Sequence, residues 1–137
     1  KCIMRGTLFV DTILAMCSMR EADMQKIRMN GAVLDGVRMA GSDCSEGVFQ
    51  GVHFGGVDQR DKKGEKTGVV WNADLSDVNF EQSDLRNSVF HEAKMKGANL
   101  TKANVAGVAF GATDLSETEL EGANVGLILN GYIPRKK

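Results

Sequence analysis

Apolar residues recur at every fifth position along most of the chain. The series includes all six phenylalanines and six of the seven methionines. Random placement at 42% apolar content would produce it with a probability of about one in a hundred million. Its 22 members are Met4, Phe9, Leu14, Met19, Met24, Met29, Leu34, Met39, Cys44, Phe49 and Phe54, then Leu75, Phe80, Leu85, Phe90, Met95, Leu100, Val105, Phe110, Leu115, Leu120 and Val125.

Small or β-branched residues form a second series, two positions before the first. Examples are Ala22, Ile27 and Ala32 in the first tract and Ala93, Ala98 and Ala103 in the second. The remaining three positions of each five are mostly polar, charged or glycine. The sequence therefore predicts that two residues in every five point into the interior of the fold.

A period of five fits neither a helix nor a continuous strand. On a helix, successive members would be rotated by roughly 140° and would scatter around the axis. On a strand they would alternate between the two faces, because the side-chain period is two. All members can face one interior only if the chain turns a corner after each pentapeptide. Seven glycines, each two positions after a member of the series, fit that turn: Gly31, Gly36, Gly41, Gly51, Gly97, Gly107 and Gly122.

The sequence resembles the pentapeptide-repeat family, whose pattern is Ala, then Asp or Asn, then Leu, then two variable residues. Close copies are Ala73-Asp74-Leu75 and Ala98-Asn99-Leu100. The resemblance implies an all-β fold, a right-handed quadrilateral β-helix with about 20 residues per coil, giving about five and a half coils interrupted by one loop, or roughly 26 Å. The residues expected in its core include Phe9, Phe49, Phe54, Leu75, Phe80, Leu85, Phe90, Leu100, Phe110, Leu115 and Leu120.

One domain spans residues 1–137, with repeat tracts over 2–56 and 68–127 and a tail or cap over 128–137. The step from Phe54 to Leu75 is one position longer than a full coil, so an insertion separates the tracts. If Val70 is the first inward residue of the second tract, the insertion adds about 11 residues to the regular repeat. Residues 55–67 then form a charged loop bounded by glycines.

This loop and the tryptophan at its base are the candidate interaction site. One interpretation is a solvated excursion with no role. The other is a binding loop on a rigid scaffold, with an aromatic anchor. The candidate residues are Asp58, Arg60, Asp61, Lys62, Lys63, Glu65, Lys66 and Trp71.

Both ends of the solenoid carry unusual apolar residues. Leu8, Ile13 and Val33 stand at outward positions and indicate a contact surface or a cap. The segment 127–133 leaves the repeat and contains Leu127, Leu129, Tyr132 and Ile133. It predicts either a cover for the last coil or a homodimer contact through the C-terminal end.

Composition and charge argue against some classes of function. With 17 basic and 18 acidic residues, no global field favours direct binding to nucleic acid, and no apolar run is long enough to span a membrane. Three cysteines, Cys2, Cys17 and Cys44, fall on inward positions and indicate small core residues in a reducing compartment. A cytoplasmic location is expected, with secretion as an effector as the alternative.

The sequence contains no recognisable catalytic arrangement. His53 and His91 lie beside inward residues and should face solvent, on different coils. No Ser-His-Asp or Cys-His set can be assembled from them. We therefore expect no catalytic residues, no cofactor and no metal site.

The favoured hypothesis is a protein-interaction scaffold or targeting domain that binds another protein. A bacterial origin, within a larger or effector protein, is what the family resemblance implies. The alternative comes from quinolone-resistance members of that family, which are thought to imitate duplex DNA and to bind gyrase. That mechanism needs a sustained negative face, whereas Asp74, Lys94 and Asp114 should alternate in one column. Only the last coil is strongly acidic by sequence, through Asp114, Glu117, Glu119 and Glu121.

Overall fold

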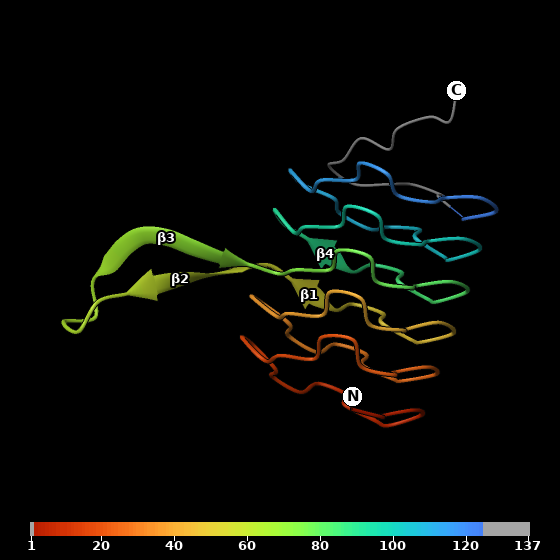
Figure 1. Cartoon of the computed structure of the whole chain (residues 1–137), viewed down its shortest axis with the longest axis horizontal. Helices are drawn as coiled ribbons and strands as arrows, with labels where there is room; N and C mark the ends of the chain where they lie inside the picture. Colours follow the sequence, from red (N-terminus) through yellow and green to blue (C-terminus); the bar gives the residue numbers. More distant parts are fainter. Residues whose placement is uncertain (1, 125–137) are drawn as a thin grey trace.

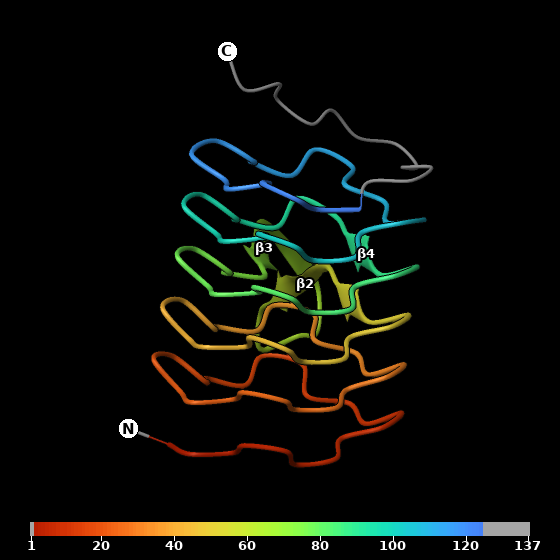
Figure 2. The same ribbon diagram turned by 90° about the vertical axis from the view of Figure 1, so that its right-hand side faces the viewer.

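The chain winds into a stack of four-sided coils, and one hairpin projects sideways from it (Figures 1 and 2). The computed structural model describes residues 2–124. The strands are β1 (His53–Phe54), β2 (Gly56–Arg60), β3 (Lys66–Asn72) and β4 (Val89–Phe90). Strands β1 and β4 pair in parallel, and β2 and β3 pair antiparallel. Elsewhere the coils are joined by isolated parallel bridges, because each side contributes only a few extended residues before the next corner.

Four columns of bridged residues define the four walls of the tube, here named A to D in chain order. Wall A passes through Ile3, Asp23, Asp43, Asn79, Asn99 and Glu119, and wall B through Leu8, Arg28, Val48, Asp84, Asn104 and Asn124. Wall C passes through Ile13, Val33, His53, Val89 and Ala109, and wall D through Ser18, Arg38, Asp74, Lys94 and Asp114.

The register confirms the predicted length of a coil. Asn104 and Asn124 are bridged across a separation of 20 residues, and their side chains are hydrogen-bonded at 3.3 Å. The predicted column of Asp74, Lys94 and Asp114 is also present.

One coil is longer than the others. Its start is bridged to the next coil across a separation of 36 residues, as between Asp43 and Asn79. The bridge from Arg38 to Asp74 spans the same distance along the chain. The extra length is the hairpin formed by β2 and β3, which leaves the tube and returns to it within this coil.

Each corner is a turn closed by a backbone hydrogen bond across three residues. The Ile27 amide donates to the Met24 carbonyl at 3.1 Å, for example. The corner residue, two positions after the inward one, has a positive φ, as at Gly31 (69°) and Gly51 (64°). Glycine relieves the steric cost of this conformation, which explains its recurrence at the corners.

The core is a column of apolar side chains with stacked phenylalanines at its centre. The rings of Phe54 and Phe90 stack with centroids 4.8 Å apart, and those of Phe49 and Phe80 meet edge to face at 5.3 Å. Nine of the predicted core residues are buried: Phe49, Phe54, Leu75, Phe80, Leu85, Phe90, Leu100, Phe110 and Leu115. The other two, Phe9 and Leu120, are only partly buried, because they belong to the outermost described coils.

Two expectations about inward residues are wrong. Val70 is 44% exposed and pairs with Asp58 in the hairpin, so Ala73 and Leu75 are the first inward residues of the second tract. The insertion is consequently longer than expected by one side of a coil. Cys2 is exposed, because no further coil packs beneath it in the described structure, while Cys17 is partly buried and Cys44 fully buried.

Candidate functional site

The hairpin β2–β3 leaves the tube at the corner between walls C and D (Figure 1). Gly36 occupies this corner with a φ of +65°. A Cβ there would meet Met16 Sδ at 2.5 Å, the Trp71 carbonyl oxygen at 3.1 Å and Val57 Cγ2 at 3.3 Å. The absence of a side chain at Gly36 therefore lets the root of the hairpin lie directly against the coil.

The segment expected as a charged loop is a two-stranded ribbon. Val57 pairs with Trp71 and Asp58 with Val70, and the register is irregular between Asp58 and Arg60. β-Branched and aromatic residues favour extended backbone, which accounts for strands at both ends of the insertion. The strand pairing fixes which side chains lie opposite each other along this arm, which extends well beyond the walls (Figure 1).

Several of the predicted interaction residues build the hairpin themselves. Asp61 accepts hydrogen bonds from the amides of Lys63 (2.8 Å) and Glu65 (3.0 Å), which closes the turn. Arg60 Nη1 donates to the Gly64 carbonyl at 2.8 Å. The Lys66 ammonium lies 3.2 Å from the Asp58 carboxylate. These groups have structural partners within the hairpin.

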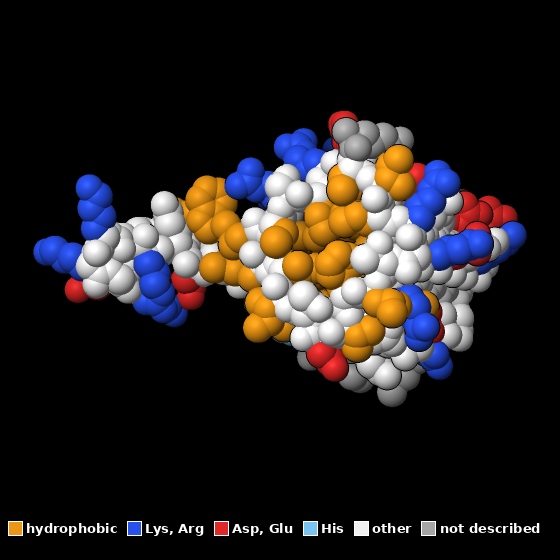
Figure 3. Space-filling view, turned by 90° about the horizontal axis from the view of Figure 1, so that it is seen from below, with side chains coloured by type: hydrophobic (Ala, Val, Ile, Leu, Met, Phe, Trp, Pro, Cys, Tyr) orange, Lys and Arg blue, Asp and Glu red, His pale blue; other side chains and the backbone are white. Residues whose placement is uncertain are grey.

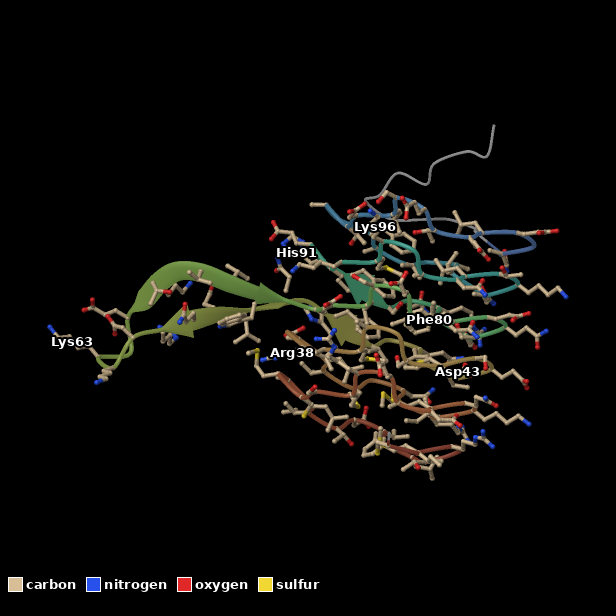
Figure 4. All side chains as sticks on the ribbon, viewed as in Figure 1. Arg38, Asp43, Lys63, Phe80, His91 and Lys96 are labelled. Atoms are coloured by element: carbon tan, nitrogen blue, oxygen red, sulfur yellow. The ribbon has the colours of Figure 1, made fainter. Side chains whose placement is uncertain are left out.

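Lysine side chains dominate what the tip offers to solvent. Lys62, Lys63 and Glu65 are exposed, and Lys63 lies at the far end of the arm (Figure 4). The tip thus presents two ammonium groups and one carboxylate in addition to the paired charges.

The root of the hairpin is apolar and exposed. Val69, Val70 and Trp71 are each 44 to 47% exposed, and Met16 on the adjoining corner is 37% exposed. Seen from below, hydrophobic side chains extend from the root of the arm onto the end of the tube (Figure 3). The predicted anchor Trp71 therefore stands within an apolar surface.

A cleft of about 200 Å³ lies where the hairpin meets wall D. It is lined by Met16, Gly36, Arg38, Trp71, Asn72, Asp74 and Lys94. The buried Oδ1 atom of Asn72 has no hydrogen-bond partner among the described residues. The cleft could not be predicted from sequence, because its residues come from several coils and their juxtaposition depends on the length of the insertion.

Wall A is the most acidic wall. It carries Asp23, Asp43, Glu81, Glu119 and Glu121 against Arg5. The corner that follows this wall adds Lys26, Glu46 and Lys102. Asp23 binds the Arg5 guanidinium at 2.6 Å, and Asp43 accepts a hydrogen bond from Gln25 at 2.9 Å. Carboxylates of this wall therefore lie on lower coils as well as on the last one.

The predicted acidic patch is divided between two walls. Glu119 belongs to wall A, Asp114 lies on wall D, and Glu117 lies near Lys96, with its carboxylate 3.7 Å from the ammonium. Hydrogen bonds from Ser116 lower the pKa of Asp114. This carboxylate is consequently charged at neutral pH.

The histidines and cysteines do not form a catalytic set in the described residues. His53 Nδ1 is 2.6 Å from Asp35 Oδ1, which also accepts the Gly55 amide. His91 lies 3.9 Å from Glu92. Burial raises the pKa of the Cys44 thiol to about 12, so this thiol is protonated at neutral pH.

Residues 2–124 hold neither a metal-binding cluster nor a membrane-spanning helix. No group of three or more His, Cys, Asp or Glu residues is arranged there to hold a metal ion. The same residues contain no helix that is long and apolar enough to cross a membrane. The predicted cap over 128–137, and the dimer contact expected of it, lie outside the described residues.

The chain belongs to the pentapeptide-repeat family. The family model, described as pentapeptide repeats, matches residues 17–56 and 73–108 in 8 copies, on either side of the hairpin. Membership confirms the predicted all-β, right-handed quadrilateral β-helix.

Solved structures similar to this chain include other pentapeptide repeat proteins. One from the cyanobacterium Cyanothece 51142 is 15% identical, with a TM-score of 0.31 over 95% of this chain and 88% of that one. One from the Arabidopsis thaliana thylakoid lumen is 22% identical, with a TM-score of 0.31 over 90% and 67%. The full-length plasmid-mediated fluoroquinolone resistance protein QnrB1 is 13% identical, with a TM-score of 0.30 over 91% and 73%. No curated protein matches the sequence.

Proposed function

We propose that the protein is a non-catalytic interaction module that binds another protein through the hairpin β2–β3. The observation that carries this proposal is the arm itself, with Val69, Val70 and Trp71 exposed at its root. A plain corner would close this coil without the segment 56–71. The chain instead inserts a two-stranded ribbon into an otherwise regular coil.

The physical properties of the hairpin suit a recognition element. Loops and arms on a rigid scaffold can present side chains without reorganising the core. Tryptophan is enriched among residues that dominate binding energy, because it buries a large area at a low cost in side-chain entropy.

The test uses a deletion that the structure itself defines. Removing the segment 56–71 joins Gly55 to Asn72 and restores the regular step from Phe54 to Leu75. The intact chain and this variant serve as bait, together with Trp71→Ala. We expect a protein captured by the intact chain to be lost with the deletion and weakened at least tenfold by Trp71→Ala when rebound in purified form.

Lys102→Ala is the control, because Lys102 is an exposed corner residue on the side of the tube away from the hairpin root. If every protein that binds the intact chain also binds the deletion variant with equal affinity, the hairpin is not the binding element and the proposal is wrong.

A second candidate function is imitation of duplex DNA, and the acidic wall A favours it. Its five carboxylates are distributed over several coils and outnumber Arg5 and the two corner lysines, and this excess of negative charge supports the proposal. A gyrase supercoiling assay, with and without a quinolone, tests it. We expect protection that is lost when Asp43, Glu81 and Glu119 are changed to the corresponding amides; an unchanged supercoiling reaction at micromolar protein excludes this function.

A further inference from the structure

The cleft between the hairpin and wall D combines an apolar side with a cationic side. Trp71 and Met16 supply the apolar side, and both are partly exposed. Arg38 and Lys94 supply the cationic side and are both exposed (Figure 4 labels Arg38 near the root of the arm).

The two cations of the cleft lack close carboxylate partners within residues 2–124. No ion pair within 4.0 Å involves Arg38 or Lys94. Asp74 lies between them in the wall D column, but its Oδ1 accepts hydrogen bonds from the Ser76 amide (3.1 Å) and hydroxyl (2.7 Å). The cleft therefore has one more positive than negative group and unused donors on its cationic side.

We propose that this cleft binds an extended segment of a partner protein in which an apolar residue is followed by acidic residues. The apolar side chain would pack on Trp71 and Met16, and the carboxylates would accept hydrogen bonds from Arg38 and Lys94. Charge-assisted hydrogen bonds of this kind are stronger than neutral ones. The inference deepens the proposed function, on which it rests, by naming the chemistry that the partner contributes.

Nucleic acid fits this surface less well than an acidic peptide. Backbone binding to nucleic acid requires several cations that follow a line of phosphates. Here the two cations are separated by Asp74, and the neighbouring outward positions of wall D include Asp114. Wall D also carries Arg20 and Lys96, but Ala40 and Ser76 separate these two along the wall, and Lys96 lies 3.7 Å from the Glu117 carboxylate. The charge pattern therefore suits two adjacent carboxylates and does not continue as a basic track.

Trp71 is the sole tryptophan of the chain and reports directly on the cleft. The probe is the peptide acetyl-Ser-Leu-Asp-Asp-Gly-amide, added to the complete protein. We expect a saturable blue shift of the Trp71 emission. The matched peptides with Asn-Asn in place of Asp-Asp, or with Gly in place of Leu, should bind at least tenfold more weakly.

Charge-removing variants test the cationic side separately. Arg38→Gln and Lys94→Gln should each weaken binding of the Leu-Asp-Asp peptide about tenfold, equivalent to about 1.4 kcal/mol. Arg28→Gln is the matched control, because Arg28 has the same position in the repeat on wall B, on the opposite side of the tube. Its binding should equal that of the unchanged protein.

Three results would overturn the inference. They are the absence of any change in Trp71 emission and in the backbone amide resonances of wall D at millimolar peptide, equal binding of the Asp-Asp and Asn-Asn peptides, and binding of an oligothymidylate in preference to the peptides. If a partner is captured through the hairpin but the acidic peptide does not bind, the proposed function stands and the inference about the cleft fails.

Discussion

The corner residues of the tube adopt a backbone conformation that most side chains avoid. Twelve non-glycine residues have a positive φ at corners, among them Lys26, Glu46 and Lys102. For residues with a Cβ this left-handed conformation costs about 1 to 2 kcal/mol each. The stacked backbone hydrogen bonds of the coils must offset that cost, and glycine at other corners avoids it.

Alanine substitutions at two corner glycines distinguish the cost of backbone strain from the cost of a steric clash with the hairpin. A Cβ added at Gly51 would have nothing within 4 Å, so Gly51→Ala should lower the free energy of unfolding by about 1 to 2 kcal/mol through strain alone. Gly36→Ala should cost more, because its Cβ also meets the Trp71 carbonyl oxygen. Urea denaturation followed by circular dichroism measures both. If the two variants lose the same free energy of unfolding, the root of the hairpin does not contact Gly36 closely.

The buried thiol of Cys44 should make stability depend on alkaline pH. Its pKa is raised to about 12 from an ordinary value of 9.0, mainly by burial. Between these values the unfolded chain releases the proton while the folded chain keeps it, so folding stability falls as the pH rises. The slope is about 1.4 kcal/mol per pH unit.

The comparison with Cys44→Ala isolates this contribution. The variant is less stable overall, because it leaves a cavity, but it should lack the Cys44 part of the slope above about pH 9. Unfolding free energies measured from neutral to alkaline pH give the difference. Parallel pH profiles for the two proteins would show that the thiol is not buried in the folded state.

At the level of elements, the hairpin is an insertion that the coil accommodates without losing register. Val33 bridges to His53 before the insertion, and Arg38 bridges to Asp74 after it. The walls therefore continue through the long coil as if the segment 56–71 were absent. Gly36, at the corner where the arm leaves, is the position most closely fitted to the extra strands.

Removal of the segment 56–71 should consequently leave the solenoid intact. The far-ultraviolet circular dichroism per residue should change only by the loss of the two strands. The free energy of unfolding should stay within about 1 kcal/mol, because a long excursion adds little loop-closure entropy. A deletion one residue longer is the control, because it shortens the step from Phe54 to Leu75 to four positions, too few to complete a side of the coil, and should lower the free energy of unfolding.

The repeat and its interior could be predicted from sequence because a period of five leaves few alternatives. The pattern predicts Phe49, Phe80 and Phe110 in the core, and all three are buried. The stacking of one tract on the other could not be predicted in the same way. Taking Val70 as inward makes the insertion too short by one side of a coil, which rotates the second tract by one wall.

The sequence does not predict two of the surfaces, because their composition depends on which wall of the second tract lies above which wall of the first. The cleft contains Arg38 from the first tract and Lys94 from the second, and wall A contains Asp43 and Glu81. Both surfaces combine the two tracts, so they emerge only when the correct corner has been assigned to the hairpin. Lys94 and Asp114 belong to one tract, so the sequence alone predicts that they share a column, as they do.

On the scale of the whole molecule, the first described coil differs from the middle of the tube. The interior is closed along the middle coils, but this coil presents apolar groups to solvent, as the view from below shows (Figure 3). Leu8 is 63% exposed and Ile13 76% exposed. Exposed apolar surface of this kind attracts apolar ligands.

A hydrophobic dye should therefore bind at this end of the described tube. We expect enhanced fluorescence of anilinonaphthalene sulfonate, and at least a halving of that signal in the double variant Leu8→Lys, Ile13→Lys. Val48→Lys is the control, because Val48 lies in the same column as Leu8 but two coils further along. Equal dye signals in all three proteins would place the dye elsewhere.

The stacking of the coils also determines how the molecule unfolds when a mechanical force is applied to it. Each coil is held only by the coils above and below, so a force applied to the two chain ends should peel coils away one at a time. A regular coil of 20 residues releases about 7 nm of extended chain, and the coil that carries the arm, with 36 residues, releases about 12 nm. In an optical trap, one long step among short ones would mark the moment at which the arm is pulled free.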